Sequence, residues 1–137
     1  MKNPGSAFLR NISGAAVGGS IFVLFVDDDA AFADAAARSL EAAGMRTVVA
    51  LGSAAALDAV DSNTFDVVVT DIKLPAVETH GLALTRLIRN KRPRVPVILM
   101  TTYPDVFEDE VALPGAVLCK PVELAEICRE IKARLAQ

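Results

Sequence analysis

Short apolar runs alternate with amphipathic stretches from residue 21 to the carboxyl end of the chain. The apolar runs are rich in Val, Ile, Leu and Phe, which is typical of strands that are covered on both faces. The stretches between them have the period of helices. This alternation predicts repeated strand-helix units and a parallel sheet. We expect strands at residues 21–26, 46–51, 65–70, 97–100 and 116–119.

A helix is expected after each strand, at residues 30–43, 53–60, 82–90, 103–113 and 122–135. Asp29 is the expected N-cap of the first helix and Gly44 its stop, and Ser53 is expected to cap the second. The fourth helix is expected to be short or irregular, because it contains Pro104 and is cut short by Pro114. The sequence therefore predicts an α/β fold with a doubly wound, five-stranded parallel sheet. The last helix carries an apolar stripe of Leu124, Ile127, Ile131 and Leu135.

Composition fits one folded domain, since 53% of the 137 residues are apolar and 23% are charged. We expect this domain at residues 21–137, after a flexible leader or a segment left from cloning at residues 1–20. The net charge of -3 offers no basic stripe for direct binding of nucleic acid. The apolar run at residues 12–26 is shorter than the roughly 18 residues of a membrane span. Cys119 and Cys128 lack metal-type spacing, so reduced thiols and a cytoplasmic protein are expected.

Polar side chains occupy the carboxyl ends of four of the five expected strands, where ligands of open parallel sheets bind. The first strand is followed by Asp27 and Asp28, and the third by Asp71. Thr101 and Thr102 end the fourth strand, and Lys120 follows the fifth. Converging carboxylates repel one another, and a hard divalent cation such as Mg²⁺ or Mn²⁺ relieves that repulsion. With an ammonium opposite the cation, Asp71 could attack a phosphoryl group.

These residues belong to four motifs: F-V-D-D-D, V-V-V-T-D-I-K-L-P, L-M-T-T and C-K-P, each at the end of an expected strand. In this order and at these separations the chain resembles the receiver domains of bacterial two-component response regulators, a CheY-like superfamily. The resemblance implies a flavodoxin-like sheet of strand order 2-1-3-4-5. It also implies a cis peptide bond before Pro121. The implied roles are phosphoacceptor for Asp71, phosphate binding for Lys120, a mobile hydroxyl for Thr101, and metal binding for Asp27 (partly through water), Asp28, Asp71 and the backbone carbonyl of Lys73.

The chain departs from the family pattern at three places. The loop from Pro75 to Gly81 is longer than usual, and the spacing of 19 between Thr101 and Lys120 is shorter, which again points to an altered fourth helix. Val117 stands where receivers commonly carry a switching aromatic residue, so the usual readout is in question. Tyr103 and Lys73 occupy two positions that tune the lifetime of the phosphoryl group in this family, so we expect an altered lifetime.

The resemblance implies a switch that is phosphorylated on Asp71 by a histidine kinase or a phosphotransfer protein and is read by an unknown downstream protein. Such a domain transfers a phosphoryl group only to itself and is not an enzyme in the ordinary sense. No membrane contact is expected, and homodimerisation stays open. One alternative is a pseudo-receiver that acts as an interaction scaffold without phosphorylation. A second is a Mg²⁺-dependent phosphatase, which usually needs an acidic residue where this chain has Lys73. His80, the one histidine, is expected to be exposed.

Overall fold

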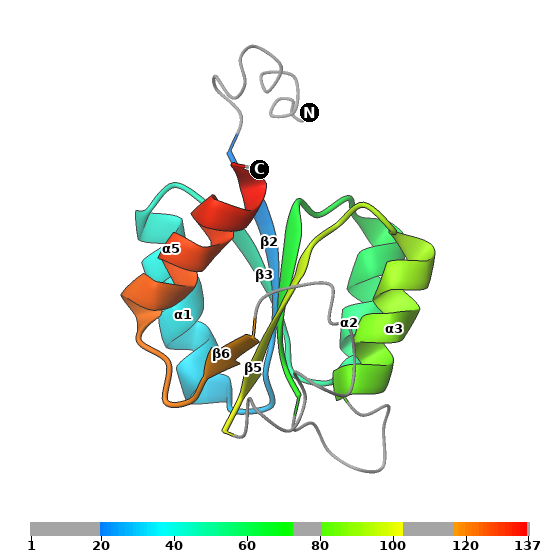
Figure 1. Cartoon of the computed structure of the whole chain (residues 1–137), viewed down its shortest axis with the longest axis horizontal. Coiled ribbons are helices and arrows are strands. Elements are labelled where there is room, and N and C mark those ends of the chain that lie inside the picture. Colours follow the sequence, from blue (N-terminus) through cyan, green and yellow to red (C-terminus); the bar gives the residue numbers. More distant parts are fainter. Residues whose placement is uncertain (1–19, 73–80, 103–116, 137) are drawn as a thin grey trace.

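The computed structural model describes residues 20–72, 81–102 and 117–136, which form three layers (Figure 1). A central parallel sheet lies between two pairs of helices. Its strand order is β3-β2-β4-β5-β6, which is the predicted order 2-1-3-4-5. The strands are β2 (Phe22–Val26), β3 (Arg46–Ala50), β4 (Val67–Asp71), β5 (Val97–Thr101) and β6 (Val117–Cys119).

Among the described residues, two helices cover each face of the sheet. In Figure 1, α1 and α5 lie on one side of the strands, and α2 and α3 lie on the other. Within the described part of the chain, no helix combines the length and the apolar character needed to cross a membrane. The helices are α1 (Ala30–Ala42), α2 (Ser53–Ser62), α3 (Gly81–Lys91) and α5 (Leu124–Leu135).

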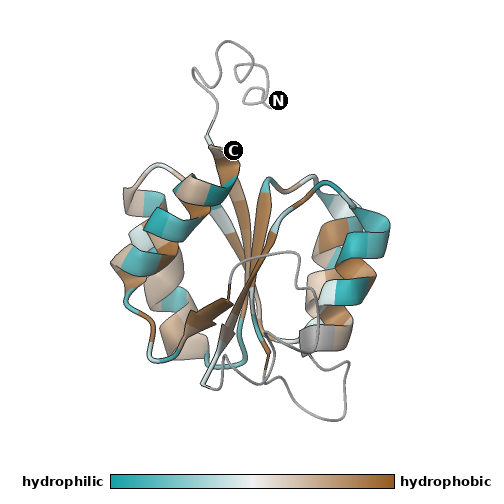
Figure 2. Ribbon diagram, in the orientation of Figure 1, coloured by the Kyte–Doolittle hydropathy of each residue, from teal (hydrophilic) through white to brown (hydrophobic). Residues whose placement is uncertain are grey.

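Two apolar cores form because neighbouring residues of a strand point to opposite faces of the sheet. Val23 and Phe25 of β2 pack on the side of α1 and α5, whereas Leu24 and Val26 pack on the side of α2 and α3. All four are fully buried, which explains why the strand has an unbroken apolar sequence. In Figure 2 the strands at the centre are mostly hydrophobic, and the hydrophilic positions lie mainly on the helices. The apolar stripe of α5 is confirmed, with Ile127 and Ile131 buried at its centre.

The ends of the elements differ from the predicted ends by one or two residues, and one predicted cap is wrong. Asp29 caps α1 as predicted, since its carboxylate accepts a hydrogen bond of 3.1 Å from the backbone of Phe32. Gly44 follows α1 with a φ of 90°, a left-handed conformation that glycine adopts without strain. Ser53, however, is the first residue of α2, and Gly52 is its N-cap. The backbone N–H of Ala56 donates to the carbonyl oxygen of Gly52, so Gly52, and not Ser53, is the residue that precedes the helix.

All five strands are parallel, so their carboxyl ends lie at one edge of the sheet, the lower edge in Figure 1. Backbone pairing fixes this alignment, with Val26 opposite Thr70 and Asp71 opposite Met100. The predictions for the leader, for most of the 75–81 loop and for the fourth helix lie outside the described residues.

Candidate functional site

Four of the predicted site residues come directly from strand ends at this edge. Asp27 follows β2, Asp71 is the last residue of β4, and Thr101 is the last residue of β5. Lys120 follows β6, and its backbone N–H donates a 2.8 Å hydrogen bond to the carbonyl oxygen of Thr101. The sheet itself therefore brings together residues that are up to 93 positions apart in sequence.

Lys120 joins the carboxylates of two strand ends. Its Nζ lies 3.1 Å from Oδ2 of Asp71 and 3.4 Å from Oδ2 of Asp27. Only 5% of the Asp71 side chain and 1% of the Asp27 side chain are exposed, against 28% for Lys120. Lys120 is thus the most exposed of the three side chains. Charge-assisted hydrogen bonds of this kind hold both carboxylates in defined positions.

Burial and neighbouring charge act against each other in this cluster. Burial raises the pKa of Asp27, and the nearby Asp71 carboxylate raises it further, although the hydrogen bond from the backbone of Asp29 and the charge of Lys120 lower it. Burial alone would lower the pKa of Lys120. The hydrogen bond to Asp71 and the attraction of both carboxylates outweigh burial, so the pKa of Lys120 is raised. The site therefore favours a charged lysine and disfavours a second negative charge at Asp27.

The carboxylates are arranged so that one cation could contact all three. Asp27, Asp28 and Asp71 each offer an oxygen, and these oxygens lie within 4.8 Å of one another. Asp28 is exposed, whereas the other two are buried, so a cation could enter from the solvent side. Three carboxylate oxygens are a donor set that suits hard divalent cations such as Mg²⁺. The fourth predicted ligand, the backbone carbonyl of Lys73, lies outside the described residues.

Thr101 is buried at the end of the neighbouring strand and is tied to Lys120 through the backbone. The cis peptide bond between Lys120 and Pro121, which the resemblance implied, is present. Val117 begins β6 and is half-buried, packed against the core on the side of α2 and α3. The site therefore combines an acidic cluster, an ammonium and a buried hydroxyl residue at adjacent strand ends.

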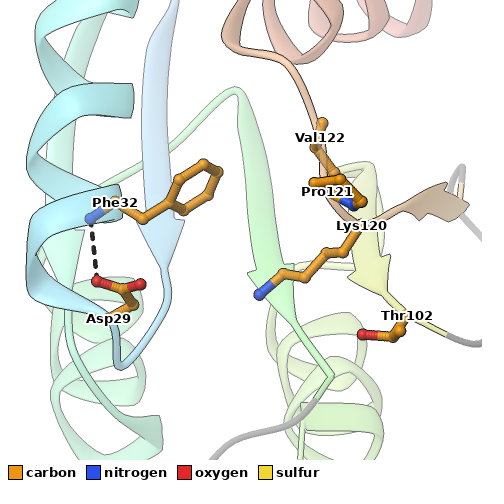
Figure 3. A pocket seen from close by; sticks show the side chains of 6 residues that line it. All are labelled: Asp29, Phe32, Thr102, Lys120, Pro121 and Val122. Carbon is orange, nitrogen blue, oxygen red and sulfur yellow. Dashed lines mark hydrogen bonds between the residues drawn. The ribbon is translucent and has the colours of Figure 1, made fainter.

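Phe32 also belongs to this region, although it was not among the predicted site residues. The Nζ of Lys120 lies 5.9 Å from the centre of the Phe32 ring, within the range of a cation–π contact. Its position four residues after Asp28, in the first turn of the helix, is the sequence feature that could have placed it near the site. Figure 3 shows Phe32 among the residues around a pocket that Lys120 also lines.

Comparison with known proteins agrees with this geometry. The model of the response regulator receiver domain matches residues 23–132. The chain belongs to this family. Among curated relatives of this receiver domain, the response regulator MprA of Mycobacterium sp. (strain KMS) is 31% identical over 116 residues, which cover 82% of the chain and 50% of MprA. The DNA-binding transcriptional regulator NtrC of Escherichia coli (strain K12) is 37% identical over 84 residues, covering 61% of the chain and 18% of NtrC.

Solved structures show the same fold. The receiver domain superposes on a CheY-like response regulator receiver domain protein from Methanospirillum hungatei JF-1 with a TM-score of 0.77, at 29% identity over 86% of the chain and 95% of that protein. It superposes on the chemotaxis response regulator CheY4 of Vibrio cholerae with a TM-score of 0.75, at 22% identity over 83% of the chain and 98% of CheY4. The receiver domain thus matches whole solved chains, whereas it spans about a fifth of NtrC and half of MprA.

Proposed function

We propose that this receiver domain accepts a phosphoryl group on Asp71 in a Mg²⁺-dependent reaction and signals through a change of conformation. The observation that carries the proposal is the position of Asp71. Its carboxylate lies 3.1 Å from the Lys120 ammonium and also belongs to the cluster of three acidic side chains. A phosphoryl group bound there would meet positive charge from two directions, which is what phosphoryl transfer requires.

Asp71 is the proposed nucleophile. One of its oxygens forms the new P–O bond while the bond from phosphorus to the leaving group of the donor breaks, and the product is an aspartyl phosphate. Burial shields this carboxylate, since only 5% of its side chain is exposed. A carboxylate that is held in place by Lys120 loses little further freedom when it attacks, which favours the reaction.

Lys120 and Thr101 are the proposed partners of the phosphoryl oxygens. The Lys120 ammonium now contacts both Asp71 and Asp27, so it can keep one carboxylate while it turns toward the incoming group. The raised pKa of Lys120 keeps it charged at neutral pH. Thr101 can donate its hydroxyl from the adjacent strand end.

Asp27, Asp28 and Asp71 are the residues that would hold Mg²⁺, together with the backbone carbonyl of Lys73. When bound, the ion supplies positive charge that stabilises the phosphoryl oxygens. Without such an ion, burial raises the pKa of Asp27 and repulsion by the Asp71 carboxylate raises it further. The exposed Asp28 has the easiest access for a cation from solvent.

The phosphodonor in the cell is proposed to be a histidine kinase or a phosphotransfer protein, and the state of Asp71 is proposed to be read by a separate protein target in the cytoplasm. Phosphoryl transfer to and from Asp71 is the only chemistry required, so the domain acts as a switch and not as an enzyme with an external substrate. Val117 leaves the usual aromatic switch position occupied by a small side chain. We therefore expect the conformational signal to run through Thr101 and its neighbours without that aromatic residue.

The test is incubation with Mg²⁺ and acetyl phosphate, followed by measurement of the intact mass. Wild type should gain the mass of one phosphoryl group, and Asp71→Asn should not. Asp58→Asn removes an exposed carboxylate on α2 and serves as the matched control, which should be labelled like wild type. Omission of Mg²⁺ or addition of EDTA should suppress labelling. If wild type gains no mass under these conditions, the proposal fails and the domain is better described as an interaction scaffold.

A further inference from the structure

A pocket of about 360 Å³ lies at the amino edge of the sheet, where β5 begins, and so at the opposite end of this strand from Thr101. The strand has five residues, which places its two ends roughly 13 Å apart at about 3.3 Å per residue. The walls come from the end of α3, the segment before β5 and the end of α5, all at the upper edge of the sheet in Figure 1. The described residues that line it are three arginines, two prolines and two aliphatic residues, without an acidic one.

The three arginines come to this pocket from separate places in the chain. Arg89 lies in the last turn of α3, Arg134 lies in the last turn of α5, and Arg94 lies between α3 and β5. The Nε of Arg134 donates a 3.1 Å hydrogen bond to the Glu130 carboxylate, so the charge of Arg134 is already partly balanced. Arg89 and Arg94 form no ion pair with another residue of the ranges 20–72, 81–102 and 117–136. Two guanidinium groups therefore line the pocket without a carboxylate partner in these ranges.

A tight turn holds the backbone of Arg94 in place. Pro93 and Arg94 are the two central residues of this turn, and the backbone N–H of Val95 closes it with a 3.1 Å hydrogen bond to the carbonyl oxygen of Arg92. Proline is favoured at the first central position of such turns because its ring fixes φ. The turn is also tied to α2, since the Arg92 guanidinium donates a 2.9 Å hydrogen bond to the carbonyl oxygen of Val60. The backbone that carries Arg94 is thus fixed before any ligand arrives, which lowers the cost of binding.

Cations near helix ends also have an ordinary structural role, because the carbonyl end of a helix carries about half a negative charge. This role accounts for Arg89 and Arg134, in the last turns of α3 and α5. It does not account for Arg94, which lies outside the helices. Two helix ends and Glu130 together supply about two negative charges against three guanidinium groups, so the pocket keeps about one positive charge in excess. This excess is local, since the chain as a whole has a net charge of -3 and repels anions.

We propose that this arginine pocket, defined by Arg89, Arg94 and Arg134, binds a small molecule that carries a diphosphate group. A guanidinium group pairs with phosphate oxygens through two parallel N–H donors. A diphosphate carries charge on both of its phosphate groups, so it can engage Arg89 and Arg94 together, whereas a monocarboxylate can engage only one of them. The volume of about 360 Å³ is at the lower end of the range for small-molecule pockets, which favours a compact ligand over a segment of protein. The prolines and aliphatic residues supply an apolar wall for an organic group on the diphosphate.

The test is titration of the whole chain with inorganic pyrophosphate in low salt and EDTA, followed by isothermal calorimetry. EDTA is present because Mg²⁺ at the acidic cluster on the other edge of the sheet could itself attract phosphate groups. Wild type should bind one pyrophosphate per chain. Arg89→Gln and Arg94→Gln should each raise the Kd about fivefold, the effect of losing one pair of unit charges about 4 Å apart in water.

Glu130→Gln tests the same electrostatics in the opposite direction. It frees Arg134 for the ligand and should lower the Kd by up to about fivefold, an improvement that a loss of structure could not produce. Arg129→Gln removes the same charge from the exposed face of α5, outside the pocket, and is the matched control, which should leave the Kd unchanged. Circular dichroism of each variant checks that it is folded. Labelling of Asp71 by acetyl phosphate should be unchanged in Arg94→Gln, because the two sites lie at opposite edges of the sheet.

Comparison of ligands separates the sources of the diphosphate group. ADP should bind at least as tightly as pyrophosphate if the pocket takes an organic diphosphate, and more weakly if it takes free pyrophosphate. The inference is wrong if pyrophosphate does not bind, or if Arg129→Gln weakens binding as much as Arg94→Gln, since binding would then be a nonspecific effect of charge. It is also wrong if a short glutamate peptide binds more tightly than pyrophosphate, because the arginines would then form a contact for an acidic protein.

Discussion

Replacement of Asp27 by Asn should stabilise the metal-free protein, although it removes a partner of Lys120. The Asp27 oxygen lies within 4.8 Å of its counterpart on Asp71, so at an effective dielectric constant of about 20 the two charges repel by about 3.5 kcal/mol. On the same scale, Lys120 at 3.4 Å attracts Asp27 by about 5 kcal/mol. Repulsion by Asp71 and attraction by Lys120 are thus of similar size and largely cancel. Burial of a carboxylate that is only 1% exposed decides the balance, as its raised pKa indicates.

We expect Asp27→Asn to raise the free energy of unfolding by about 1 to 2 kcal/mol, in the range found when buried ionic groups are replaced. The Asn oxygen can still accept the backbone N–H of Asp29, and Lys120 keeps Asp71, its closer partner. The assay is urea unfolding at pH 7 in EDTA, followed by circular dichroism because the chain contains no tryptophan. Asp58→Asn is the control and should change the free energy by less than about 0.5 kcal/mol.

The stability difference between Asp27→Asn and wild type should depend on pH in a definite direction. Since the folded-state pKa of Asp27 is raised, the folded protein holds this proton more tightly than the unfolded chain does. The contribution of Asp27 to the stability of the wild type therefore falls as the pH rises from the ordinary carboxylate pKa through the folded-state pKa, and this loss is complete above it. The advantage of Asp27→Asn should be largest at neutral pH and should shrink toward acidic pH. A variant that is less stable than wild type at pH 7 in EDTA would refute this reasoning.

The other predictions concern the cation, the ammonium and one turn. Mg²⁺ should stabilise wild type by about 2.7 kcal/mol at 100 times its Kd, and Asp28→Asn should lose most of this gain in thermal melts. Lys120→Met should slow labelling by acetyl phosphate roughly a hundredfold or more, as for loss of other transition-state donors, whereas Lys132→Met on the exposed face of α5 should not. Gly44→Ala should cost about 1 to 2 kcal/mol in urea unfolding, because Gly44 has a φ of 90° and an added Cβ would meet no atom within 4 Å. The lost stability would then come only from the strained backbone conformation at position 44, and an unchanged free energy of unfolding in Gly44→Ala would contradict this prediction.

The fold could be predicted because every central strand is covered on both faces and so has an apolar sequence without interruption. Strand order, in contrast, came from the resemblance, since periodicity does not say which strands are neighbours. The wrong prediction at Ser53 has a local cause. Ser is a common N-cap residue, but here its backbone is already helical and Gly52 provides the extended residue before it. Dihedral angles, not residue type, decide where a helix begins.

The site was predictable as a set of residues, but the approach of Phe32 to it was not. Parallel strands place their carboxyl ends together, so Asp27, Asp71 and Lys120 meet once the topology is known. Phe32 has the spacing of a core residue of α1, and its ring does pack against Phe25. The same ring also approaches Lys120, and only its place in the first helical turn after Asp28 indicates this second contact.

The electrostatics of the site connect its stability with its proposed chemistry. A protein that only needed a stable edge of the sheet would gain by replacing Asp27, because burial makes this carboxylate costly beside Asp71. The cost becomes useful only if a cation or a phosphoryl group later enters the cluster, since a bound cation removes the repulsion and contributes its full attraction to binding. A gain in stability upon Asp27→Asn in EDTA that disappears in saturating Mg²⁺ would therefore link the two properties directly. If the gain were equally large with and without Mg²⁺, the acidic cluster would not be a cation site.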